Sequence, residues 1–100
     1  MAQKQIIWSK KSEFEFRSIL EFYNQRNGNS NYSLKIVDAT EKLLKLIQQN
    51  NYLGKLSNNK KTRVINLEVF LIFYDIADKQ ISIVSFWDNR QNPQNRMDSN

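Results

Sequence analysis

The side chains of this chain that can do chemistry are mainly lysine, arginine, tyrosine and tryptophan, because it contains no histidine and no cysteine. Without histidine it lacks the commonest general base and the commonest metal ligand, and without cysteine it has no thiolate nucleophile or thiolate zinc site. Its two glycines are too few for a glycine-rich phosphate-binding loop. The sequence therefore argues against the usual hydrolases, metalloenzymes and nucleotide-binding proteins, and we expect no cofactor and no metal.

Basic side chains gather at two places in the C-terminal half. Lys60 and Lys61 end a predicted loop, Arg63 opens the strand that follows it, and Arg90 follows the last predicted strand. An arginine at a strand end can hold a phosphate or a carboxylate with its planar guanidinium group. If the chain is a nuclease, these four residues are its candidate catalytic residues. In the alternative, purely structural interpretation, Arg63 pairs with an acidic side chain.

A second candidate group surrounds Arg90 and is a candidate surface for binding a target. Its members are Trp87, Asp88, Asn89, Arg90 and, from the earlier strand, Arg63. The aromatic residues Tyr74 and Trp87 are more simply interpreted as core residues, because large aromatic side chains in strands are usually buried. Arg90 is the member of this group whose position beside a strand end most favours a functional role.

The N-terminal half predicts the elements that support these groups. Residues 5–8 form a short apolar run that is typical of a strand. Apolar side chains then recur every three or four residues over 16–23 and again over 36–47, which is the period of one helix face. The link between the two helices is short, so we expect an antiparallel helix hairpin.

Capping residues predict where these helices begin and end. Ser12 and Glu15 have the spacing of a capping box, although Ser9 is an equally good first cap. Gly28 ends the first helix, because glycine readily adopts the left-handed conformation of a helix C-cap. Ser30 begins the second helix.

The C-terminal half changes to the alternating pattern of strands. Residues 50–61 are polar, contain three lysines and predict a connecting loop with an exposed basic patch. Segments 62–67, 69–76 and 80–87 are rich in Val, Ile, Phe and Tyr, as strands are. Residues 77–79 are short enough for a tight hairpin between the last two strands.

The predicted fold class is therefore α+β. We expect a two-layer domain with the order strand-helix-helix-strand-strand-strand, in which an antiparallel sheet is covered on one face by the helix hairpin. One domain is expected over residues 1–93, and residues 94–100 are expected to form a disordered tail because they have almost nothing to bury.

The charge balance and the N-terminus limit the partners and the location. Fifteen Lys and Arg against ten Asp and Glu give a net charge of +5. This excess favours nucleic acid, anionic lipid or an acidic protein segment as a partner, without choosing among them. The first residues contain no apolar run long enough for a secretory signal or a membrane span, so we expect a cytoplasmic protein with no membrane partner.

Three segments together resemble the RelE/ParE toxin superfamily. The opening QIIWSKKSEFEFRSILEFY is similar to the first strand and helix of these toxins, and VFLIFYDI followed by QISIVSFWDNRQNP is similar to their closing sheet. The ending FWDNRQNP is the most specific part and resembles the ParE-like branch in particular. The resemblance covers roughly residues 4 to 93.

This resemblance implies the toxin of a type II toxin–antitoxin system, neutralised by a cognate antitoxin protein that wraps its surface. In the ParE-like branch the toxin inhibits DNA gyrase and is not itself an enzyme. In the RelE-like branch it is a metal-independent endoribonuclease that cleaves mRNA on the ribosome with Lys, Arg and Tyr.

One departure from the RelE-like pattern favours the ParE-like branch. The pattern of RelE-like nucleases has an arginine just after the first aromatic residue of the third strand. In this chain Phe70 is that aromatic residue, and Leu71 stands in place of the arginine. Leucine cannot stabilise charge on a phosphate, and losing one such donor typically costs about 10²–10³ in rate. Arg63 or Arg90 could compensate from a neighbouring strand. A third alternative is a non-toxic binding module of the same fold.

Overall fold

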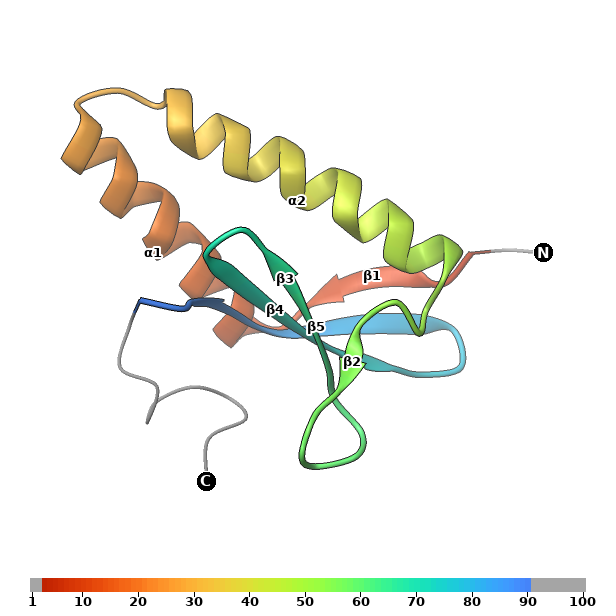
Figure 1. The fold of residues 1–100 in the computed structure, drawn as a ribbon. Coiled ribbons are helices and arrows are strands. Elements are labelled where there is room, and N and C mark those ends of the chain that lie inside the picture. The colour runs from red at the N-terminus through yellow and green to blue at the C-terminus, as the bar shows by residue number, and fades with distance from the viewer. Residues whose placement is uncertain (1–2, 91–100) are drawn as a thin grey trace.

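The computed structural model describes residues 3–90, which form two layers (Figure 1). A hairpin of two helices lies on one face of a twisted sheet, as the sequence predicted. The elements are β1 (Gln5–Trp8), α1 (Lys10–Asn27), α2 (Asn31–Gln49), β2 (Lys55–Leu56), β3 (Arg63–Leu67), β4 (Phe70–Ile76) and β5 (Gln80–Asp88). The predicted α+β class and the predicted order of strand, helices and strands are confirmed.

The sheet differs from the expected antiparallel arrangement in one respect. Its order is β1-β5-β4-β3-β2, and β1 runs parallel to β5, so the sheet is mixed. The other pairs are antiparallel, because short turns join β3 to β4 and β4 to β5. Since β1 is separated from β5 by the whole helix hairpin, no turn dictates their relative direction.

The loop predicted at residues 50–61 contains a short strand. The two residues of β2 pair with the start of β3 and form one edge of the sheet. The turn that follows holds Lys60 in the left-handed region, with a φ of 60°. The two-residue turn between β3 and β4 likewise holds Glu68 at a φ of 56°. Neither position carries glycine, which explains why no clear signal in the sequence marks the second turn.

The first helix is capped by Ser9, one of the two predicted caps, and begins at Lys10. The Ser9 hydroxyl accepts a hydrogen bond from the Ser12 backbone N–H at 3.0 Å. Gly28 ends the helix with a φ of 70°, as expected of a glycine C-cap. Ser30 precedes α2, although its side chain makes no capping hydrogen bond.

The main core lies between the helix hairpin and one face of the sheet. The helices contribute the predicted apolar stripes, and the strands contribute alternate residues of β4 and β5. Its buried members include Ile19, Tyr23, Ile36, Leu43, Leu44, Ile47, Phe70, Ile72, Tyr74, Ile81, Ile83 and Phe86. Tyr74 therefore is a core residue.

A second, smaller cluster uses the intervening residues of the same strands. Leu71, Phe73 and Trp87 are buried together, with Val64 and Val84 packed against them. Because successive strand residues point to opposite faces, this cluster lies on the sheet face away from the helices. We call it the open-face cluster. It confirms that Trp87 is a packed aromatic residue.

The predicted tail and the last residues of the predicted domain fall outside the described part of the chain. The expected tail, residues 94–100, lies beyond residue 90, as do the last three residues of the expected domain. Within residues 3–90, no helix has the length and apolar character needed to cross a membrane.

Candidate functional site

Arg63 lies at the start of β3 and holds the preceding loop against the sheet. Its Nη1 donates a hydrogen bond to the carbonyl of Gly54 at 2.8 Å, and its guanidinium carbon lies 4.8 Å from the centre of the Tyr52 ring. The neighbouring hydroxyl of Tyr74 accepts a hydrogen bond from the Gly54 N–H and donates one to the Asn51 carbonyl, both at 2.8 Å. Within residues 3–90, the arginine is thus held by backbone and an aromatic ring, and not by an acidic side chain.

The two candidate lysines lie on the turn between β2 and β3. Lys61 forms an ion pair with Asp75, at 3.7 Å between Nζ and Oδ2. Asp75 also accepts a hydrogen bond from the Thr62 hydroxyl at 2.6 Å, so its carboxylate fastens this turn to the end of β4. Lys60 is exposed.

Arg90 lies at the opposite end of the sheet, just after β5. Its Nε and Nη2 donate to the two carboxylate oxygens of Asp88 at 3.0 and 2.8 Å, in the bidentate arrangement that suits arginine. The Tyr23 hydroxyl donates to the same carboxylate at 3.2 Å, and its ring centre lies 5.3 Å from the guanidinium carbon. The carboxylate is nearly buried, whereas the Arg90 side chain is 50% exposed. Asp88 and Tyr23 therefore hold Arg90 in place while leaving half of it accessible.

The candidate residues form two separate groups. Arg63 pairs with Tyr74 across the sheet and Asp88 pairs with Phe70, so these positions lie four residue steps apart along β4. At the usual rise of a strand this is about 13 Å, and Arg90 lies two residues further on. The structure brings Lys61 and Arg63 to one end of the sheet, and Trp87, Asp88, Asn89 and Arg90 to the other.

Between these two ends lies Leu71, an apolar residue at the position where the RelE-like pattern has an arginine. Leu71 is 8% exposed and belongs to the open-face cluster, packed with Phe73 and Trp87. The sheet face away from the helices is thus filled by apolar side chains there, and offers no donor to a phosphate.

The Arg90 end borders a groove between α1 and the end of β5. The groove has a volume of about 890 Å³. Aromatic and charged side chains line it, among them Phe14, Phe22, Arg26, Trp87 and Arg90. Phe14 and Phe22 are 71% and 54% exposed, so this face of α1 is covered by no other part of the described chain. The indole Nε1 of Trp87 is buried and has no hydrogen-bond partner within residues 3–90.

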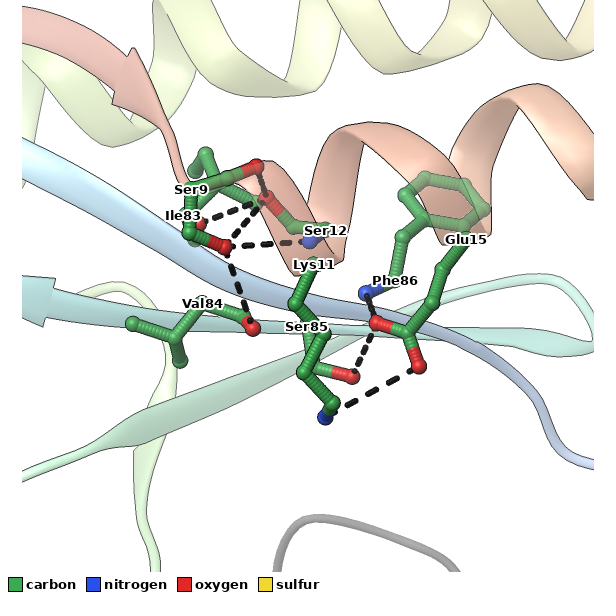
Figure 2. Close-up of polar contacts among 8 residues, drawn as sticks. All are labelled: Ser9, Lys11, Ser12, Glu15, Ile83, Val84, Ser85 and Phe86. Carbon is green, nitrogen blue, oxygen red and sulfur yellow. Dashed lines mark hydrogen bonds and ion pairs between the residues drawn. The ribbon is translucent and has the colours of Figure 1, made fainter.

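The start of α1 is fixed to β5 by polar contacts (Figure 2). The buried Ser12 hydroxyl donates to the Ile83 carbonyl at 2.7 Å. One turn later, Glu15 accepts hydrogen bonds from the Ser85 hydroxyl at 2.9 Å and from the Phe86 N–H at 3.3 Å. Ser12 and Glu15 have the spacing that predicted a capping box, yet both side chains join the helix to the sheet.

Two tyrosines have perturbed ionisation. Burial raises the pKa of Tyr74 above its ordinary value, against smaller opposite effects of the Gly54 hydrogen bond and of Arg63. Burial also raises the pKa of Tyr32, helped by the negative charges of Glu68 and Asp88. At neutral pH both tyrosines stay protonated, so neither is poised as a general base. Among residues 3–90, no three His, Cys, Asp or Glu side chains are grouped so that they could hold a metal ion.

Comparison with known families identifies the family of this chain. The model of the family described as the ParE toxin of the type II toxin–antitoxin system, parDE, matches residues 6–93. The chain belongs to this family. No curated protein sequence matches it.

Two solved structures of toxin–antitoxin proteins have the same fold. The chromosomal ParDE toxin–antitoxin system from P. aeruginosa contains a chain that is 24% identical, with a TM-score of 0.72. The YoeB dimer from Staphylococcus aureus is 25% identical, with a TM-score of 0.60. Each comparison covers 84% of this ParE-family chain and 94% of the other chain. The predicted membership of the RelE/ParE superfamily is confirmed.

Sequence reasoning singled out Trp87, Asp88 and Arg90 in the groove but missed the residues of α1 that line its other side. Phe14, Ser18, Phe22 and Arg26 recur every fourth residue and so share one face of α1. The signal available in the sequence was the pair Phe14 and Phe22, two aromatic residues on that face beside the core stripe. The role of Tyr23 in holding Asp88 had no such signal, because the two residues meet only in the folded chain.

Proposed function

We propose that this ParE-family toxin inhibits DNA gyrase in the cytoplasm and is neutralised by a cognate antitoxin protein. On this proposal it is an inhibitory binding protein and not an enzyme. The family match supports the toxin class, and the similar chain from P. aeruginosa belongs to a ParDE toxin–antitoxin system, which supports an antitoxin as partner. The net charge of +5 also suits an acidic antitoxin segment.

The observation that carries the choice of mechanism is the dispersal of the basic side chains. A nuclease without histidine or metal needs several cationic groups around one phosphate, because charge develops there in the transition state. Here Arg63 is held by Gly54 and Tyr52, and Arg90 lies beyond the other end of β4. Leu71 fills the space between them with apolar surface. This arrangement favours binding to a protein target over cleavage of RNA.

We assign the target contact to the end of β5, with Arg90 as its central side chain. Arg90 is half exposed and held in a fixed orientation by Asp88, which limits the entropy that it loses on binding. Arginine is enriched among the residues that dominate protein interfaces. Asn89 precedes it in the chain, and Trp87 lines the same groove. Arg63 lies at the other end of the sheet and is assigned a structural role.

The experiment is inducible expression without antitoxin, followed by pulse labelling of DNA and protein synthesis. Early arrest of DNA synthesis, together with inhibition of purified gyrase by the full chain, is the expected result. Early arrest of protein synthesis with cleaved mRNA on ribosomes would instead establish the endoribonuclease. Normal growth with folded, abundant protein would make the chain a non-toxic binding module.

The site assignment needs variants that stay folded. Trp87→Ala is unsuitable, because removing a buried tryptophan typically costs about 3–5 kcal/mol. Arg90→Ala and Trp87→Phe preserve most of the packing. Full toxicity of both variants would show that the end of β5 does not contact the target.

A further inference from the structure

The positive charge of the chain is concentrated in one stretch. Between Glu41 and Glu68 there are six basic residues and no acidic one, whereas the rest of the chain has nine basic and ten acidic residues. The net charge of +5 therefore comes from this stretch alone. Four of the six residues lie in the hairpin of β2, the following turn and the start of β3, namely Lys55, Lys60, Lys61 and Arg63. We call residues 55–64 the basic hairpin.

The lysines of the basic hairpin lie on the side of the molecule away from the helices. In Figure 1 the turn of this hairpin extends beyond the sheet, away from α1 and α2. Lys55 pairs with Val64, which packs in the open-face cluster, so Lys55 shares that face. Lys61 reaches the same face, because its partner Asp75 follows a core residue of β4 and strand residues alternate. Lys60 lies in the turn between them.

The three ammonium groups are accessible and little neutralised. Lys55 and Lys60 are exposed, and neither has an ion pair within residues 3–90. The side chain of Lys61 is 75% exposed, and its single ion pair, with Asp75, is long at 3.7 Å. Only the fourth cation, Arg63, is held by other groups of the chain. The basic hairpin thus presents several positive charges against one carboxylate.

The turn that carries these lysines is ordered by its own side chains. The Asn59 carboxamide oxygen accepts hydrogen bonds from the backbone N–H groups of Lys61 and Thr62, at 2.9 and 2.8 Å. The Thr62 hydroxyl donates to Asp75 at 2.6 Å and so fastens the turn to β4. Binding of a ligand would therefore order only the lysine side chains, and not the backbone that presents them.

The chemistry of this surface suits a chain of phosphates better than a peptide. Ser57, Asn58 and Asn59 precede the lysines of the turn, so the turn offers charge and hydrogen-bond donors without an apolar anchor. Leu56 lies on the other face of the hairpin, because strand residues alternate. Lysine binds phosphate as a point charge. A two-stranded ribbon also fits the major groove of duplex DNA.

We propose that the basic hairpin binds the phosphate backbone of duplex DNA, so that the toxin contacts gyrase and the DNA on it together. The inference rests on the proposed function, since it names gyrase-bound DNA as the ligand. Lys55, Lys60 and Lys61 contact phosphates without reading the base sequence. Arg90, which we assign to the gyrase contact, lies at the other end of the sheet, so the two contacts do not compete.

Three phosphate contacts make a weak site by themselves and an effective one on the enzyme. The logarithm of the affinity should fall with the logarithm of the salt concentration with a slope of about −2.7. Non-specific DNA sites of this kind reach dissociation constants of about 10⁻⁴ M at physiological salt. Once the toxin is anchored on gyrase, the effective concentration of DNA is roughly millimolar. The toxin should therefore bind gyrase with DNA about 10-fold more tightly than gyrase alone.

The first test titrates the full chain with a short fluorescent DNA duplex at several salt concentrations. The double variant Lys55→Gln/Lys60→Gln should reduce the salt slope to about −1 and weaken binding about 10-fold or more at low salt. Lys10→Gln/Lys35→Gln is the matched control, because it removes two exposed lysines of the helices that have no ion pair within residues 3–90. It should keep the wild-type slope. Equal weakening by both double variants would overturn the proposal, since only the net charge would matter.

The second test compares the affinity of the chain for gyrase with and without bound DNA. The wild type should prefer gyrase with DNA about 10-fold, and Lys55→Gln/Lys60→Gln should lose this preference. Equal affinities of the wild type for the two forms would overturn the proposal. Tighter binding of single-stranded RNA than of duplex DNA would overturn it in favour of RNA. A double variant that keeps its affinity for DNA but loses affinity for the antitoxin would assign the basic hairpin to an acidic protein instead.

The two tests fail separately from the proposed function. If the wild-type chain does not bind gyrase, the proposed function is contradicted, while the duplex titration still decides whether the basic hairpin binds DNA. If the wild type inhibits gyrase but Lys55→Gln/Lys60→Gln binds duplex and gyrase–DNA like the wild type, the inference alone is contradicted.

Discussion

The two ends of the sheet each place an arginine beside a tyrosine, and the two arginines have different roles. Arg63 donates to the Gly54 backbone, next to the fully buried Tyr74, and closes a loop. Arg90 is paired with Asp88 and remains half exposed at the mouth of a groove. An arginine at a strand end is therefore not a functional residue by position alone. The groups that it contacts, and how much of its side chain they leave exposed, decide whether it can reach another molecule.

Replacing each arginine by alanine should separate their roles, with the larger effect on target inhibition at Arg90. Arg90→Ala should weaken inhibition of gyrase by roughly 30-fold, as for an interface arginine that contributes about 2 kcal/mol. Arg90 is half exposed but its partner carboxylate is nearly buried, so the free energy of unfolding should fall by about 1–3 kcal/mol. Purified variants are compared in a supercoiling assay and by thermal unfolding. Arg63→Ala is the control: it should be less stable, but its folded fraction should inhibit gyrase as well as the wild type. Loss of inhibition by Arg63→Ala, with full inhibition by Arg90→Ala, would reverse our assignment of the two ends.

The next effect concerns the stability of the Arg63 end. Tyr74→Phe leaves the Gly54 N–H and the Asn51 carbonyl without their partner, which should cost about 1–3 kcal/mol. For a domain of this size, each kcal/mol lowers the melting temperature by roughly 4–8 °C. Tyr52→Phe is the control, because its hydroxyl makes no such hydrogen bond and the residue is exposed. Equal melting temperatures for the two variants would show that the loop is held by other contacts.

Alkaline pH should also lower the stability of the fold, through the ionisation of Tyr74 and Tyr32. The pKa of Tyr74 is raised in the folded chain, so the unfolded chain loses this proton first, at about pH 10. Stability should therefore fall as the pH rises from about 10 toward the higher pKa of the folded state. Tyr32 contributes in the same direction. The fall should be smaller in Tyr74→Phe, and an identical fall in both proteins would contradict a raised pKa for Tyr74.

The smallest expected effect compares the turns near the two ends. Lys60 and Glu68 both hold positive φ angles, which strain a residue that carries a Cβ atom. Lys60→Gly and Glu68→Gly should each stabilise the fold, by about 0.5–1 kcal/mol, in chemical denaturation. Gly28→Ala is the opposite change, from glycine to a residue with a Cβ atom at a φ of 70°, and should lower the free energy of unfolding. Loss of stability in either glycine variant would show that its side chain contributes more than the strain.

Much of the fold followed from periodicity and capping alone. The helix stripes, the glycine cap at Gly28 and the alternating strands predicted the class and the order of elements, since these depend on neighbours in the chain. The direction of β1 did not follow, because it is set by packing against β5, more than seventy residues away. The strand at residues 55–56 was also missed, because only its pairing with β3 makes these two residues a strand and their sequence carries no strand pattern.

The same division applies to the site. The composition excludes several kinds of chemistry, because no fold can supply a missing histidine or cysteine, and the residue order places arginines at two strand ends. The distance between these arginines, the contacts of Glu15 and Ser12 with the sheet, and the end of β1 short of the end of β5 follow only from the folded chain. Local patterns report each residue's immediate neighbours along the chain. The groove instead arises where α1, β1 and β5 fail to cover one another, and such a gap exists only between packed elements.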